Sequence, residues 1–226
     1  MNTLDVLSDI AKTYRDISQF SLINFPQQRL VQNWLQPWGE LEKAHFNYAL
    51  SMQKKTGLPF WNSIMLYAFN NVDYSPALLK SALHHNPIDV LVQVDRQDME
   101  NGFLLSLEDN KRWAVNSKVI MTDGSSRHIP MIDFHIPASD NNIFVVHDVC
   151  QALGLTKGFL LMSGVSYHFI GINLITEEEL MSLLVNALLF CPIVDGAWIS
   201  HQLRERSCSL RIDKKNGCYT KVVKKW

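Results

Sequence analysis

The hydrophobic pattern changes its period near residue 88, and this change limits the folds open to the chain. Before it, "LDVLSDIAKTYRDISQF" spaces apolar residues three and four positions apart, which is typical of an amphipathic helix. After it, "IDVLVQVD", "GFLLSLE", "RWAVNSKVIMT" and "HIPMIDFHI" are short apolar runs separated by polar turns, which is typical of strands. We therefore predict a helical region at residues 1–87 and a sheet that begins at residue 88.

The rest of the chain continues with mixed elements. "NNIFVVHDVCQALGL" predicts a helix, "KGFLLMSGVSYHFIGINLI" predicts two strands, and "TEEELMSLLVNALLF" predicts a helix capped by Thr176 and Glu179. The final segment predicts two strands around a Lys-Asn-Gly turn. An α+β fold follows, with helices packed on a mostly antiparallel sheet over residues 88–226.

Composition excludes several classes of protein. With 47% hydrophobic residues among 226, the chain has material for a large core, and no low-complexity run indicates disorder. The N-terminus lacks the pattern of a signal peptide, and the apolar segments are too short to cross a bilayer. The four cysteines are scattered, which favours reduced thiols. We expect a cytoplasmic protein with no membrane partner.

Charge is distributed unevenly. The net charge is −1, but residues 201–226 hold eight Lys or Arg against Glu205 and Asp213. Such a basic segment favours a phosphate-rich partner, although lysines also protect the edge of a terminal strand. The candidate contacts to nucleic acid are Arg204, Arg206, Lys214, Lys215 and Lys221.

Three strand-like segments carry polar residues that an apolar core would not favour, because unpaired polar groups are costly to bury. Carboxylates bind divalent metal ions, whereas histidine and arginine bind phosphate. This combination suits nucleotide chemistry. The residues are Asp133 and His135 in "MIDFHIP", Ser163, Ser166 and His168 in "SGVSYHFIG", and Arg211 and Asp213 in "SLRID".

These segments, together with "VDGAWISHQL", resemble the archaeo-eukaryotic primase superfamily, and more narrowly the bacterial primase 1D-like proteins. The resemblance covers about residues 88–223 and implies an RRM-like, primase-type core. It implies that Asp133 and Asp213 are catalytic acids that bind metal. It assigns nucleotide binding to four residues and places a further histidine near the same groove: Ser163, Ser166, His168 and Arg211, with His201 as the further histidine.

One residue departs from the family pattern, because His135 stands where the second acid of the first motif is expected. We predict that it joins Asp133 and Asp213 as a catalytic and metal-binding residue, with Mg²⁺ or Mn²⁺ as the metal. An imidazole suits Mn²⁺ better than Mg²⁺.

Purely structural roles stay open for these residues. Asp133 would then accept backbone hydrogen bonds at a strand end, and His135 would be a core histidine. Asp213 would form a local ion pair with the lysines that follow it.

Two functions follow from the resemblance. The first is a primase-like nucleotidyltransferase that binds nucleoside triphosphates, divalent metal and a DNA or RNA template. The alternative is a catalytically degenerate primase-like fold that binds nucleic acid, or a protein partner through residues 1–87, for instance within a bacterial defence assembly. Other classes lack support, since the chain has no phosphate-binding G-x-x-x-x-G-K-[ST], no G-x-G-x-x-G and no G-x-S-x-G.

Overall fold

A computed structural model describes residues 1–26, 39–83, 91–102, 111–214 and 217–226. The chain divides into two compact units, one formed by residues 1–26 and 88–226 and the other by residues 27–87. The second unit is therefore an insertion in the first. Residues 1–26 therefore belong with the core.

The first helix and the first strand explain why residues 1–26 join the core. Helix α1 (Thr3–Thr13) begins at Asn2, whose side chain accepts hydrogen bonds from the amides of the first turn. Strand β1 (Ile17–Pro26) follows, where the sequence predicted helix up to residue 20. Ile17 and Phe20 are fully buried, and β1 pairs on both sides. Sheet pairing therefore overrides the local helical spacing.

The first sheet has the strand order β2-β1-β3-β4, and β8 pairs with β3. The neighbouring strands in this sheet are antiparallel, which confirms the predicted α+β class. The predicted strand "GFLLSLE" lies almost entirely outside the described residues. The strands after β1 are β2 (Leu91–Asp95), β3 (Lys111–Met121), β4 (Ser126–His128) and β8 (Ser209–Arg211).

The second sheet has the order β5-β7-β6-β9 and is also antiparallel. It contains the two strands predicted around the Ser-Gly turn. Its strands are β5 (Met131–Asp133), β6 (Gly158–Met162), β7 (Tyr167–Gly171) and β9 (Lys221–Lys225).

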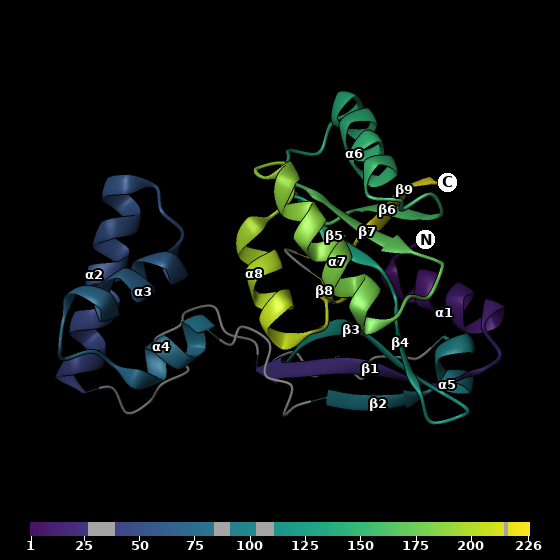
Figure 1. Ribbon diagram of the computed structural model, residues 1–226, viewed down its shortest axis with the longest axis horizontal. Coiled ribbons are helices and arrows are strands. Elements are labelled where there is room, and N and C mark those ends of the chain that lie inside the picture. Colours follow the sequence, from purple (N-terminus) through teal and green to yellow (C-terminus); the bar gives the residue numbers. More distant parts are fainter. Residues whose placement is uncertain (27–38, 84–90, 103–110, 215–216) are drawn as a thin grey trace. The chain divides into compact units, whose positions relative to one another are not determined.

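Helices pack on the sheets of this unit, and Figure 1 shows α7 and α8 beside each other. The predicted cap of α7 is confirmed, because Thr176 and Glu179 form the reciprocal pair of hydrogen bonds. The helices are α5 (Arg96–Glu100), α6 (Asp140–Ala152), α7 (Glu177–Ala187), the 3-10 turn η3 (Leu188–Phe190) and α8 (Gly196–Glu205).

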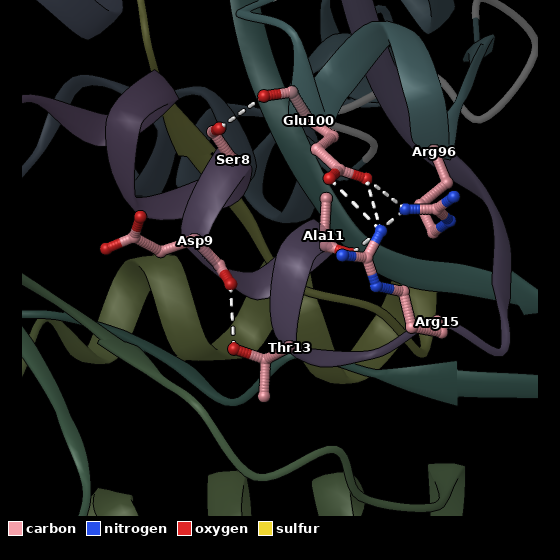
Figure 2. A network of polar contacts seen from close by, with 7 residues as sticks. All are labelled: Ser8, Asp9, Ala11, Thr13, Arg15, Arg96 and Glu100. Atoms are coloured by element: carbon pink, nitrogen blue, oxygen red, sulfur yellow. Dashed lines mark hydrogen bonds and ion pairs between the residues drawn. The ribbon is translucent and has the colours of Figure 1, made fainter.

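A polar cluster joins α1 to α5, as Figure 2 shows. The carboxylate of Glu100 pairs with Arg15 at 3.0 Å and with Arg96, and these contacts hold its pKa below the usual range. Ser8 donates its hydroxyl to the carbonyl of Glu100 at 2.8 Å. The C-terminus of α5 is therefore held against α1.

The inserted unit is helical, as predicted, in the part that the structure describes. Its small core contains Ala49, Ile64, Leu78 and Ala82. Buried His45 links its helices, since Nε2 lies 2.8 Å from the Ile64 carbonyl and Nδ1 accepts the Ser75 amide at 3.1 Å. The helices are α2 (Glu40–Thr56), α3 (Phe60–Asn70) and α4 (Pro76–Leu83).

Candidate functional site

The first two predicted motifs meet across neighbouring strands. Asp133 ends β5 and lies directly opposite His168 of β7. Their side chains form an ion-pair contact of 3.5 Å between Oδ1 and Nε2. The Asp133 side chain is 27% exposed, whereas that of His168 is 8% exposed. Asp133 is therefore the more accessible member of the pair.

The loop between β6 and β7 is shaped by its serines. Ser163 donates its amide to the carbonyl of Ser166 at 2.9 Å. Ser166 donates its hydroxyl to the carbonyl of Phe134, the residue after Asp133. Gly164 has φ of 121°, a region that strongly favours glycine. These contacts set the loop beside the end of β5.

Arg211 connects the third motif to this loop. It lies at the end of β8 and donates from Nη2 to the Ser163 carbonyl at 2.8 Å. It donates from Nη1 to the Asp213 carbonyl at 2.5 Å, and Nη1 lies 3.7 Å from Asp213 Oδ1. Asp213 is buried, and its Oδ2 accepts the Trp113 amide at 3.3 Å. Segments that are distant in sequence thus meet at one guanidinium group.

His135 has a different environment. It follows the end of β5, its side chain is 74% exposed, and Nδ1 lies 3.7 Å from Asp195 Oδ2. Its amide donates to the Ile193 carbonyl at 2.7 Å, and the Asp195 amide donates to the Asp133 carbonyl at 3.0 Å. The segment from Ile193 to Asp195 therefore runs beside the first motif.

The expected metal ligands are held by different partners. Asp133 contacts His168, His135 contacts Asp195, and Asp213 contacts Trp113 and Arg211. Within the described residues, no three His, Cys, Asp or Glu side chains form a group that would hold a metal ion. The arrangement thus does not fit a preassembled three-ligand centre, and metal binding by these residues stays a prediction.

The residues expected to contact nucleic acid lie on or just after α8, β8 and β9. Arg204 lies on α8 and is exposed, and Arg206, just after that helix, contacts Glu177 of α7. Lys214 follows β8 and Lys221 begins β9, and both are exposed. Lys215 lies outside the described residues. His201, on α8, is half-buried.

Asp195 was not among the predicted site residues. Its Oδ1 accepts the Trp198 amide at 2.9 Å and so begins α8, while its Oδ2 faces His135. Trp198 then donates from Nε1 to the Ser209 carbonyl at 2.9 Å, which fixes α8 to β8. Asp is a common N-cap residue, and Asp195 caps α8 by accepting the amide of Trp198, three positions later. No sequence pattern, however, indicates that Asp195 faces position 135.

The chain matches a known protein family over the region that holds these residues. A family model described as archaeo-eukaryotic primase 1D-like matches residues 93–224, which is more than half of the chain. The chain belongs to this family. The match confirms the predicted resemblance, and it covers the strands that carry all three motifs in this primase-like chain.

No curated protein and no solved structure gave a significant match to this primase-like chain. Within the described residues, no helix is long and apolar enough to span a membrane.

Proposed function

We propose that this chain is a primase-like nucleotidyltransferase that binds nucleoside triphosphates and extends or starts a strand on a nucleic-acid template. The observation that carries the proposal is the position of Arg211. Its guanidinium contacts the loop of the second motif and the acid of the third, beside the end of β5. Family membership supports the same activity.

The polar groups at this place suit a triphosphate. Arginine and histidine are good donors to phosphate oxygens, and arginine offers them in a planar fork. The Ser163–Ser166 loop brings backbone groups to the same edge, with glycine allowing close approach. In this proposal His168 and Arg211 face the phosphates, and Asp133 is the accessible acid at the rim.

The proposed nucleotide binding includes a divalent metal ion, because proteins bind triphosphates together with Mg²⁺ or a similar ion. Asp133 is the accessible candidate ligand. The described residues form no three-ligand group, so the proposal includes no chemical step on a metal ion.

A strand-synthesis assay tests the proposal. The protein is incubated with a single-stranded template, NTPs or dNTPs, and Mg²⁺ or Mn²⁺. We expect product from the wild type and a loss of at least about 100-fold in Asp133→Asn, the size typical for an electrostatic contact at a reacting centre. Asp148→Asn is the matched control, because Asp148 also contacts a histidine, His147, but lies on α6.

The outcomes separate the two candidate functions. Product that depends on Asp133 but not on Asp148 supports the nucleotidyltransferase. Salt-sensitive binding of nucleic acid without product under either metal would instead support the degenerate binding subunit. Neither product nor nucleic-acid binding would contradict the nucleotidyltransferase and the nucleic-acid-binding form of the alternative.

A further inference from the structure

A cavity of about 220 Å³ lies between the last turn of α1 and the β6–β9 side of the second sheet. Buried Ile10 and Phe159 form part of its apolar lining. Lys12 and Lys225 contribute two ammonium groups, and Asp9 contributes one carboxylate. The cavity belongs to the first unit alone, and its residues are distinct from those of the three motifs.

The chemistry of the lining selects an anion that also carries a hydroxyl group. Lys225 holds Nζ 4.8 Å from the centre of the Phe159 ring, a cation–π contact that keeps the ammonium group at the cavity. Lys12 is exposed on the opposite side. A phosphate would meet both lysines, a sugar hydroxyl would donate to Asp9, and the carbon face of the sugar would pack on the apolar lining.

Strand β9 leads from the candidate site to this cavity. In the β6–β9 pairing, Lys221 is opposite Met162, the residue before the Ser163 loop. At the other end of the strand, Lys225 is opposite Phe159. A strand rises about 3.3 Å per residue, so the two lysines are about 13 Å apart along β9. β9 is the edge strand of this sheet. Lys225 shares the face of Phe159, whereas exposed Lys221 and Lys224, opposite Met162 and Leu160, project from the other face, so the lysines line this edge from both sides.

We propose that the cavity binds a backbone phosphate of a single-stranded nucleic acid that leaves the candidate site along β9. The path deepens the proposed function and rests on it for the assignment of the site at which the strand begins. It adds Lys12, Lys224 and Lys225 to the residues expected to contact nucleic acid. Lys12 lies near the other end of the sequence from the basic segment at residues 201–226, so charge runs in the sequence do not indicate it.

Binding of labelled single-stranded oligonucleotides at several salt concentrations tests the path. The probes are DNA and RNA of about 4 to 16 nucleotides, the range of single-strand site sizes in compact binding domains. The variants are Lys12→Gln and Lys225→Gln. Lys54→Gln is the control, because Lys54 is an exposed lysine of the inserted unit.

For long probes we expect each variant to weaken binding severalfold and to lower the slope of log K against log salt by about 0.7, the value for one lost phosphate contact on a single strand. A dinucleotide, used as a further probe, is too short to span the roughly 13 Å between Lys221 and Lys225, so its binding should not change. Wild-type slopes for both variants at every length would overturn the proposal. Equal weakening by Lys54→Gln would overturn it as well.

Two further measurements make the test specific. Asp9→Asn should weaken the binding of RNA more than the binding of DNA, and an equal effect on both would overturn the contact to a sugar hydroxyl. Weakened binding of long probes, in a protein that makes no product, would keep the path and contradict the proposed function. Product formation, with unchanged oligonucleotide affinity in both lysine variants, would support the proposed function and contradict the path.

Discussion

Asp133 and His168 face each other across β5 and β7, with 3.5 Å between the carboxylate Oδ1 and the imidazole Nε2. The same two residues are backbone partners in the antiparallel register. Their contact is therefore set by the sheet rather than by a flexible loop. A side chain positioned in this way loses little conformational entropy when a ligand binds.

Replacing His168 with Gln should weaken nucleotide binding while the fold is kept. Glutamine retains a hydrogen-bond donor but cannot carry the positive charge that a phosphate favours. We expect the Kd for a fluorescent nucleoside triphosphate to rise about 10-fold, which corresponds to about 1.4 kcal/mol. His147→Gln, on α6, is the control and should leave the Kd unchanged. Equal Kd values for His168→Gln and the wild type would contradict a phosphate contact.

Arg211→Lys should reduce stability as well as nucleotide binding. Lysine lacks the planar fork, so it cannot donate to the Ser163 and Asp213 carbonyls together. Losing one hydrogen bond from a charged donor costs about 2 kcal/mol, which urea unfolding would detect. The same exchange at Arg127, an exposed residue of β4, should change stability by less than about 0.5 kcal/mol. A neutral result at Arg211 would show that its two contacts do not support the loop.

Acid should destabilise the protein through His128. Burial lowers the pKa of this imidazole to about 4; nearby Glu177 opposes this shift, and Lys118 adds a smaller lowering effect. Between pH 6.5 and pH 4 the unfolded chain binds a proton that the folded protein does not. Stability is therefore full above pH 6.5 and falls by about 3 kcal/mol as the pH drops to 4.

Urea unfolding of the wild type and His128→Gln across this pH range measures the effect. Other groups also titrate, so the difference between the two proteins is the relevant quantity. It should shrink as the pH falls, because only the wild type has the histidine to protonate. A difference that is constant from pH 7 to pH 4 would contradict the assignment to His128.

Two glycines of the second sheet should respond differently to alanine. A methyl group at Gly158 would lie 2.3 Å from Cζ of Phe169 and 2.6 Å from the Ile170 carbonyl oxygen. At Gly171 the nearest atom belongs to Pro130, at 3.1 Å. We expect Gly158→Ala to cost about 3 kcal/mol and Gly171→Ala about 1 kcal/mol, since overpacking against backbone cannot relax easily. Thermal unfolding of both variants gives the comparison, and equal losses would contradict it.

Much of the core was predictable because its signals are local. The capping pair Thr176–Glu179 predicted the start of α7. Strands β6 and β7 followed from two apolar runs around Ser163–Gly164. In each case the residues that fix the element lie within a few positions of one another.

The remaining features depend on residues that are distant in sequence. Strand β1 forms because β2 and β3 flank it, although its first residues continue the helical spacing of α1. The sequence also placed Asp133 and His135 in one strand-like segment. In the structure β5 ends at Asp133, and His135 instead lies near Asp195. Contacts of this kind arise from chain topology, which residue spacing alone does not contain.

The strands on either side of the inserted unit are neighbours, with Ile23 opposite Leu91 in the first sheet. From the standpoint of the sheet, residues 27–87 are therefore a single connection between two adjacent strands. The primase family model begins only at residue 93, after this connection. The pairing of these strands therefore does not depend on the length of the segment between them: a shorter, longer or different connection could join the same two strands in the same register.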